Sequence, residues 1–241
     1  MTELEKNLQT IYERIANAAA RANRDPRTIT LVAVSKTFPA DAVLAAHALG
    51  VRHFGENRVE EATDKIPAIA AQLVSATRVP TWHLIGHLQS RKVRDAVPLF
   101  DAIQSVDTVA LAQRIEQRAA QLGKVMPILL EVNIAGEASK SGFAPAPREQ
   151  FFAATRAILA LPHLDPQGLM TIAPMATAPD DPRPRATFRA LRELRDAVRA
   201  TFPERAWQHL SMGTTDDFEA AIAEGATIVR IGRAIFGTRA P

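Results

Sequence analysis

One lysine is the residue of this sequence best suited to carry covalent chemistry. Lys36 follows the apolar run at 31–34, with Ser35 between them. A lysine held at the end of a buried strand is partly desolvated, which lowers the pKa of its ammonium group. The neutral amine can form a Schiff base with a carbonyl compound. Composition and strand assignment alone favour a plainer hypothesis, in which Lys36 is an exposed loop residue whose amine reaches solvent.

Two glycine-containing turns near the C-terminus could bind an oxyanion. They cover residues 211–215 and 230–233. Glycine lets backbone N–H groups approach a phosphate, and a helix expected to begin near Thr215 would add the positive end of its dipole. Each turn alone is more often ordinary turn chemistry. Together with Lys36 they predict a lysine facing a phosphate cup, as pyridoxal phosphate or a phosphorylated carbonyl substrate would require.

Alternating helices and strands must position these residues. Three amphipathic stretches end at Gly50, Gly123 and Gly225, and each is followed by a short β-rich run. Glycine after a helix accepts the left-handed conformation of a C-terminal cap, so each unit is expected to be helix, cap and strand. The repeated alternation predicts parallel strands with crossover helices. The expected strands lie at 29–35, 51–54, 82–85, 102–105, 128–133, 167–170, 208–211 and 227–231.

The number of units favours an α/β fold of the (β/α)8 TIM-barrel type. Eight strand–helix units fit the ~250 residues of such a barrel. The last unit lacks a following helix, and an extra helix at 4–21 is expected to cover that gap. We therefore predict a single domain over 1–241, with an N-terminal helix in 1–24 packed on a barrel at 29–237. A doubly wound open sheet is the alternative, although no glycine-rich dinucleotide fingerprint follows any predicted strand.

Composition and charge exclude several classes of protein. The chain has 29 lysines and arginines against 26 aspartates and glutamates, and this net charge of +3 is too small to require nucleic acid or a membrane as partner. The absence of cysteine excludes disulfides, thiolate catalysis and iron–sulfur clusters. The N-terminus lacks the features of a secretory signal, and no apolar run approaches the ~18 residues of a membrane span. A cytoplasmic protein is therefore expected.

Two further patterns have plain structural interpretations. His83 and His87 are four residues apart, but His83 lies in a predicted strand and Gly86 follows it, so a packed or pocket-lining imidazole is favoured over a zinc ligand. Four arginines recur at helical spacing opposite an apolar face, namely Arg185, Arg189, Arg192 and Arg199. Such a stripe is usually a solvated face rather than a site for an anionic partner.

Eight motifs occur in the order of a known family. They are VAVSKT at 32–37, FGEN at 54–57, WHLIGHLQS at 82–90, KSG at 140–142, GLM at 168–170, LSMG at 210–213, DDFEAAI at 216–222 and VRIGRAIFG at 229–237. In these motifs the sequence resembles the pyridoxal phosphate homeostasis proteins, whose barrel is similar to the N-terminal domain of alanine racemase. The resemblance extends from the first predicted strand to the end of the chain.

The resemblance implies a site for pyridoxal phosphate (PLP). It implies that Lys36 holds the cofactor as a Schiff base, that Arg230 faces the pyridine nitrogen, and that Asn57 and Met170 line the pocket. The residues implied around the phosphate are Ser211, Gly213, Thr215, Gly232 and Arg233.

Two positions depart from the commonest pattern of the family. Thr214 and Thr215 stand where a Met-Ser pair is frequent, and Thr215 keeps a hydroxyl. Arg233 stands where a small hydroxyl residue is frequent. Whether the Arg233 side chain or only its backbone N–H would reach the phosphate is therefore open.

The function expected from these residues is binding rather than catalysis. Racemisation of the alanine racemase type uses a lysine and a tyrosine supplied with a second domain. The one tyrosine here, Tyr12, lies in the predicted N-terminal helix, and no residues are left for a second domain. A fixed charge on Arg230 would also disfavour protonation of the pyridine nitrogen and weaken the cofactor as an electron sink.

The resulting hypothesis is a monomeric protein that binds PLP reversibly and maintains the balance of vitamin B6 and amino acids. Its expected partners are PLP, other B6 vitamers and apo forms of PLP-dependent enzymes, without nucleic acid, membrane or metal. The alternative is an amino-acid racemase or a related PLP enzyme. A Schiff-base aldolase that acts on a sugar phosphate without a cofactor ranks below both.

Overall fold

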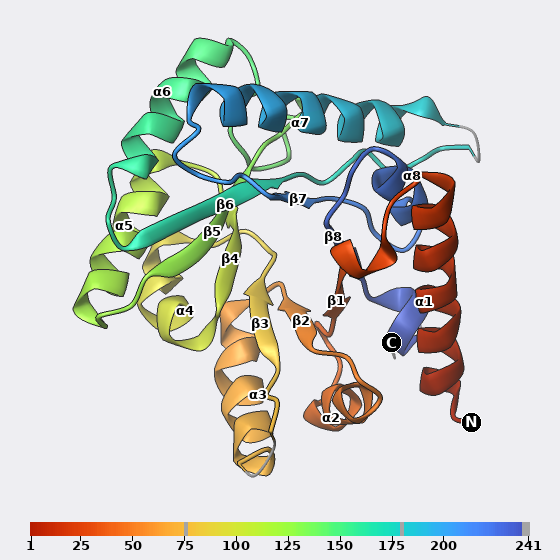
Figure 1. Cartoon of the computed structure of the whole chain (residues 1–241). Coiled ribbons are helices and arrows are strands. Elements are labelled where there is room, and N and C mark those ends of the chain that lie inside the picture. The colour runs from red at the N-terminus through yellow and green to blue at the C-terminus, as the bar shows by residue number, and fades with distance from the viewer. Residues whose placement is uncertain (75–76, 179–180, 238–241) are drawn as a thin grey trace.

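Eight parallel strands close into a barrel in the computed structural model, which describes residues 1–74, 77–178 and 181–237 (Figure 1). Each strand pairs with the next along the chain, and β8 pairs with β1. This closure confirms the (β/α)8 prediction and excludes the open sheet. The strands are β1 Thr30–Val34, β2 His53–Glu56, β3 Thr81–Leu84, β4 Ala102–Val106, β5 Met126–Glu131, β6 Leu164–Met170, β7 His209–Ser211 and β8 Ile228–Ile231.

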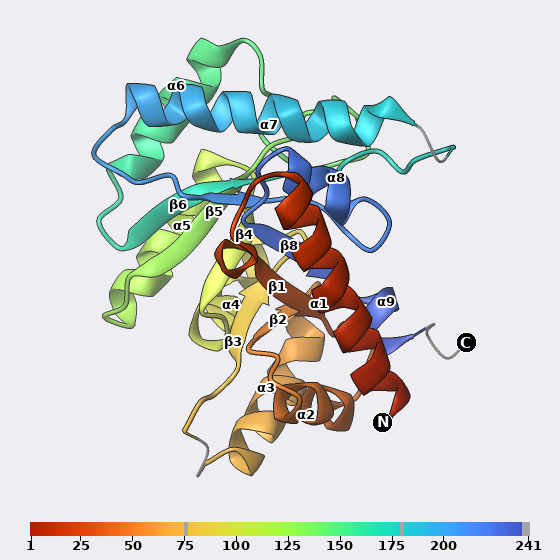
Figure 2. The same cartoon turned by 45° about the vertical axis from the view of Figure 1, so that its right-hand side comes forward.

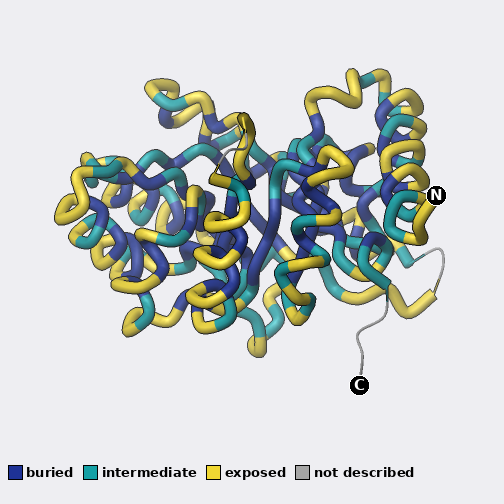
Figure 3. The backbone as a smooth tube through the Cα atoms, turned by 90° about the horizontal axis from the view of Figure 1, so that it is seen from below, coloured by how far each residue is buried: buried dark blue, intermediate teal, exposed yellow. Residues whose placement is uncertain are grey.

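Helices surround the barrel and leave the strands buried at its centre (Figure 3). They are α1 Glu3–Arg21, α2 Ala40–Ala48, α3 Val59–Gln72, α4 Val93–Leu99, α5 Val109–Gln121, α6 Arg148–Leu159, α7 Pro182–Thr201, α8 Phe218–Ala223 and α9 Arg233–Phe236, with 3-10 turns η1 Pro26–Thr28 and η2 Ser90–Lys92. The short helix α9 follows β8, where the sequence pattern predicted none.

Several predicted boundaries were wrong by one to three residues, the largest shift of a strand being the start of β6 at Leu164 rather than at 167, and two of the errors have clear local reasons. The second strand begins at His53 rather than at 51, because the Val51 N–H donates to the Ala46 carbonyl and still belongs to the cap of α2. The last full helix begins at Phe218 rather than near Thr215. The Asp217 carboxylate accepts hydrogen bonds from the N–H and the hydroxyl of Thr214, so residues 214–217 form a turn that delays the helix.

The N-terminal helix α1 packs beside α8 and α9 on the outside of the barrel (Figures 1 and 2). It starts with a capping box made by Thr2 and Glu5. The Asn7 side chain donates to the Ile235 carbonyl at 3.1 Å, and Arg14 pairs with Glu219 at 2.8 Å. These contacts join the beginning of the chain to the helices on either side of β8.

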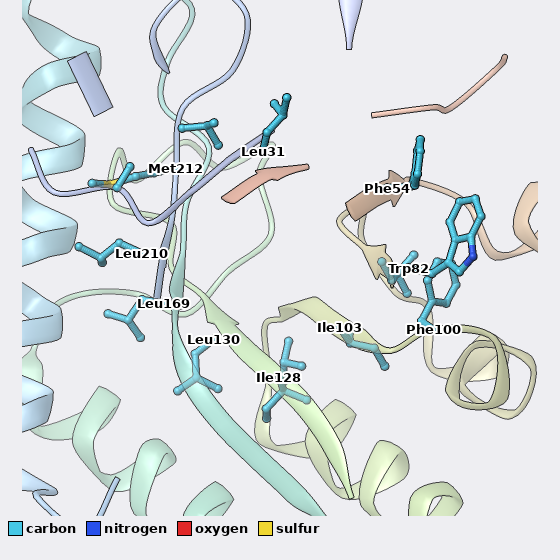
Figure 4. Close-up of a cluster of buried hydrophobic side chains, with 14 of the residues drawn as sticks. Leu31, Phe54, Trp82, Phe100, Ile103, Ile128, Leu130, Leu169, Leu210 and Met212 are labelled. Carbon is cyan, nitrogen blue, oxygen red and sulfur yellow. The ribbon is translucent and has the colours of Figure 1, made fainter. Parts of the chain in front are cut away.

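The two faces of the barrel strands have different surroundings. Outward-facing side chains of the strands pack with the inner faces of the helices in one continuous apolar cluster, part of which is shown in Figure 4. A small second cluster of Val32, Leu129, Met170 and Ile228 lies inside the barrel. Bulky branched residues usually fill such an interior. Here buried polar and charged side chains of the strands, among them His83, Gln104 and Arg230, also point into it and prepare the floor of a site.

Candidate functional site

A cavity of about 290 Å³ opens at the C-terminal ends of the strands. Its lining residues are Val34, Lys36, Asn57, Ile85, Ile172, Thr214, Thr215, Asp216, Arg230, Gly232 and Arg233. Most of the predicted site residues are therefore brought together from β1, β2, β7 and β8, which are far apart in sequence. The active sites of this barrel architecture occupy the same rim.

Three predicted residues, Met170, Ser211 and Gly213, are buried and are not among those that line the cavity. Met170 is fully buried in the apolar cluster inside the barrel. Ser211 is also fully buried, and its hydroxyl is engaged by Arg230 and Gln104. Gly213 has a φ of +94°, and a Cβ there would lie 2.6 Å from the Cβ of Ala221. Direct contact of these three with a cofactor stays a prediction, and the Ser211 hydroxyl accepts a hydrogen bond from a lining residue, Arg230.

A buried ionic cluster fixes the backbone on both sides of Lys36. The Lys65 ammonium group donates to the Ser35 carbonyl and to Glu56, both at 2.9 Å. Glu61 accepts from the N–H of Thr37 at 2.6 Å and from Lys65. Lys36 is half-buried. The backbone groups on both sides of it, the Ser35 carbonyl and the Thr37 N–H, are therefore held by hydrogen bonds.

The sequence analysis did not identify this cluster. Lys65 is only 8% exposed, and burial raises the pKa of Glu56 more than the hydrogen bonds from Lys65 and Ser35 lower it. One signal was available. Lys65 shares a face of its helix with the buried residues Ala62, Ile66 and Ile69, and a lysine on an apolar face needs a partner.

Arg230 places a cation at the floor of the cavity. Its guanidinium donates to the Ser211 hydroxyl at 2.6 Å and to the Thr171 carbonyl at 2.9 Å. Burial lowers the pKa of Arg230 to about 10, while Asp217 and Glu131 act in the opposite direction. The group consequently remains charged at neutral pH, in an orientation that two hydrogen bonds define.

The rim of the cavity carries a second arginine in a different state. The Arg233 side chain is exposed and bonds both carboxylate oxygens of Asp216, at 2.7 and 2.8 Å. An ion pair this exposed is weak and can exchange for another anion. The charge of Arg233 is thus available at the mouth, although in this structure a carboxylate holds it.

A second cavity of about 220 Å³ shares Asn57, Ile85 and Ile172 with the first. Its other walls include Glu131, whose Oε2 is buried without a hydrogen-bond partner among the described residues. Burial, aided by the charge of Asp107, raises the pKa of Glu131 to about 7. The second cavity is therefore lined by a carboxyl group that can be protonated near neutral pH.

The two histidines of the sequence pattern have separate surroundings. His83 lies inside the barrel against His53 and Gln104, in agreement with the interpretation as a packed imidazole. His87 lies at the rim and contacts Asp107 and Ser141. Within residues 1–74, 77–178 and 181–237, no group of three histidine, aspartate or glutamate side chains is arranged to hold a metal ion.

The basic stripe of α7 has a structural partner. Arg185, Arg189 and Arg192 surround the buried carboxylate of Glu224 at the end of α8. Burial raises the pKa of Glu224, but the hydrogen bonds from Arg185 and Arg189 and the charge of Arg192 outweigh it and lower the pKa overall. Separately, none of the helices in the described part of the chain is long and apolar enough to cross a membrane.

Comparison with known proteins defines the class first. The sequence profile of the family described as "Alanine racemase, N-terminal domain" matches residues 6–240. The solved alanine racemase of Clostridium difficile superposes with a TM-score of 0.70 at 16% identity, over 97% of this chain and 56% of that one. At this identity the likeness shows the fold, which is the barrel of the racemase class.

Nearer relatives define the family within that class. A protein of Pseudomonas aeruginosa named "Pyridoxal phosphate homeostasis protein" is 45% identical, over 99% of this chain and 97% of its own length. PipY of Synechococcus elongatus PCC7942, solved with PLP bound, is 37% identical with a TM-score of 0.77, over 94% of this chain and all of that one. The chain belongs to the pyridoxal phosphate homeostasis protein family.

Proposed function

We propose that this protein binds PLP through an imine bond at Lys36 and that it stores and releases the cofactor without robust turnover of its own. The observation that carries the proposal is one cavity that Lys36 and the buried, charged Arg230 line together. Formation of the imine would join the Lys36 nitrogen to the aldehyde carbon and release one water molecule. The name of the relatives and the PLP-bound structure of PipY support the choice of ligand.

The residues of the cavity fit a phosphorylated aldehyde. Gly213 has a positive φ, and a Cβ at Gly232 would lie only 3.0 Å from the Val34 carbonyl oxygen. The two turns therefore have space for backbone but not for a side chain at these positions. Thr215, Gly232 and Arg233 all line the cavity, where their hydroxyl, N–H and guanidinium groups would hold the phosphate. Gly213 would support this cup, Ser211 would hold Arg230, and Asn57 and Met170 would bound the ring.

Arg230 explains why binding would outweigh catalysis. Bound PLP supplies an electron sink for carbanions, and that sink is strongest when the pyridine nitrogen is protonated. A charged guanidinium facing this nitrogen would oppose its protonation. The one tyrosine of the sequence, Tyr12, lies on α1, outside the barrel. It is therefore not placed to act as the second base opposite Lys36.

The experiment that tests the proposal compares visible absorbance of the wild type and of Lys36→Ala after addition of PLP and removal of the excess. We expect a yellow imine band in the wild type, its loss on reduction with borohydride, and no band in Lys36→Ala. Lys6→Ala, which changes an exposed lysine of α1, serves as the control and should keep the band. A wild type without a band at saturating PLP would overturn the proposal in favour of the cofactor-free aldolase.

The racemase alternative needs its own measurement. Chiral chromatography of single amino acids incubated with the PLP-loaded protein would detect racemisation, and steady turnover at ordinary enzyme rates would contradict the storage function.

We further propose a cytoplasmic, single-domain monomer that passes PLP to apo-enzymes and also accepts other B6 vitamers. Light scattering should give a mass near 26.2 kDa for the monomer.

A further inference from the structure

A chain of buried hydrogen bonds crosses the inside of the barrel. Arg230 Nη1 lies 2.6 Å from Ser211 Oγ, which lies 2.6 Å from Gln104 Oε1. Gln104 Nε2 is 3.0 Å from His83 Nδ1, and His83 Nε2 is 3.0 Å from Nδ1 of His53. Five side chains are thereby connected from the floor of the cavity to the N-terminal half of the barrel.

The contact between Gln104 and Ser211 spans the barrel rather than following the sheet. Gln104 belongs to β4 and Ser211 to β7, and β5 and β6 lie between these strands. Their hydrogen bond can therefore form only through the interior. It ties the wall that carries Arg230 to the opposite wall that carries His83.

Every hydrogen bond in the chain has the same direction. Arginine is a donor only, so the Ser211 oxygen accepts from Arg230 and its proton is donated to Gln104 Oε1. The amide nitrogen of Gln104 then donates to His83 Nδ1, which leaves the proton of His83 on Nε2, where it is donated to His53. Turning the amide over would present a second donor to the Ser211 oxygen and remove the acceptor of its proton.

The protonation of His83 agrees with this direction. Burial, followed by the charges of His53 and His209, lowers the pKa of His83 to about 3, so its imidazole is neutral at physiological pH. A neutral imidazole has one donor and one acceptor. The chain uses both, and it therefore selects a single tautomer.

The chain is suited to holding an orientation and unsuited to moving protons. The amide of Gln104 cannot pass a proton from one side to the other under ordinary conditions, because it is neither acidic nor basic near neutral pH. Buried networks whose members are all satisfied instead fix one arrangement of their groups.

We propose that Ser211, Gln104 and His83 are positioning residues that hold the Arg230 guanidinium in the orientation in which it meets the ring of the bound cofactor. The inference rests on the proposed function for the identity of the ligand, but the chain itself exists without it. It assigns Ser211 a role under the ring, through Arg230, in place of direct contact with the phosphate.

The test combines a measurement on the unliganded protein with one on the loaded protein. The ¹⁵N chemical shifts of the histidine rings report the tautomer of His83, and titration with PLP reports affinity and the position of the imine band. The variants are Ser211→Ala and Gln104→Met, with Ser211→Thr to restore the hydroxyl. Ser105→Ala is the matched control, because the buried hydroxyl of Ser105 has no hydrogen-bond partner among the described residues.

We expect His83 to be the pure Nε2–H tautomer in the wild type and a mixture of tautomers in Gln104→Met. Ser211→Ala and Gln104→Met should each weaken PLP binding about tenfold and displace the imine band, since hydrogen bonds to charged groups are strong when buried. Ser105→Ala should keep the wild-type affinity and band, and Ser211→Thr, which restores the hydroxyl, should bind PLP more tightly than Ser211→Ala.

Two results would overturn the inference. One is a mixture of His83 tautomers in the unliganded wild type, and the other is wild-type PLP affinity and absorbance in Ser211→Ala. Failure of the proposed function has a different signature, because the wild type would then show no imine band that depends on Lys36, whatever the tautomer of His83.

Discussion

At the scale of single residues, the reactive group depends on neighbours that carry no chemistry themselves. Lys36 is the residue that would form a covalent bond, yet the segment from which it extends is fixed by Lys65, Glu56 and Glu61. Such clusters are costly to bury and more costly to break, because removal of one partner leaves a charge without compensation. The position of Lys36 should therefore be sensitive to substitution of Lys65, although Lys65 does not line the cavity.

Lys65→Met tests this dependence. We expect a loss of about 3 kcal/mol in the free energy of unfolding, because Glu56 would stay buried without its cation. The affinity for PLP should fall as well, because the Ser35 carbonyl loses its donor. Urea denaturation and PLP titration are the two measurements.

Lys92→Met is the matched control for Lys65→Met. Lys92 also pairs with a glutamate of α3, Glu60, but that glutamate is 59% exposed. An exposed pair contributes about 0 to 1 kcal/mol. Equal losses in the two variants would show that the buried cluster has no special role.

At the scale of elements, the sequence was most informative where helix and strand meet at glycine. Gly50, Gly123 and Gly225 all have positive φ angles, as the predicted caps require. Two of the errors arose where a polar side chain or a cap changed the boundary, as Asp217 does before α8. Such effects depend on side-chain hydrogen bonds that the periodicity of apolar residues does not record.

The helix α1 provides a prediction at this scale. Ile11 is 1% exposed, on the face that α1 turns toward the barrel. Ile11→Ala should lower the free energy of unfolding by about 3 kcal/mol, because buried isoleucine to alanine changes leave a cavity. Glu13→Ala, on the exposed face of the same helix, should change it by less than about 0.5 kcal/mol. Similar small effects of both substitutions on urea denaturation would mean that α1 is not docked in solution.

At the scale of the whole molecule, the fold was more predictable than the inside of its site. The order of helices and strands defines which residues reach the rim, so Lys36, Asn57, Arg230 and Gly232 could be placed together from sequence. The contact of Gln104 with Ser211 could not, because it depends on which strands face each other across the closed barrel. No local pattern in either strand contains that information.

The closed barrel also gives the whole molecule a pH-dependent stability, through Glu131. Its pKa is raised from 4.5 to about 7 in the folded protein, so the folded state keeps a proton that the unfolded state loses. The contribution of Glu131 to stability is then largest below about pH 4.5 and falls as the pH rises toward about 7. Glu131→Gln, which imitates the protonated acid, should become more stable relative to wild type by on the order of 2 kcal/mol between about pH 5 and 8.

Urea denaturation of the PLP-free proteins at several pH values measures this difference, and working without the cofactor separates it from any titration of the imine. Glu149→Gln, a change at an exposed position, should follow the wild-type curve throughout. Parallel curves of unfolding free energy against pH for Glu131→Gln and the wild type would contradict the prediction. They would mean that the surroundings of Glu131 in the barrel are more polar than its burial indicates. The buried Arg230 would then already compensate the ionised carboxylate, and the floor of the site would keep one charge state over the whole physiological range.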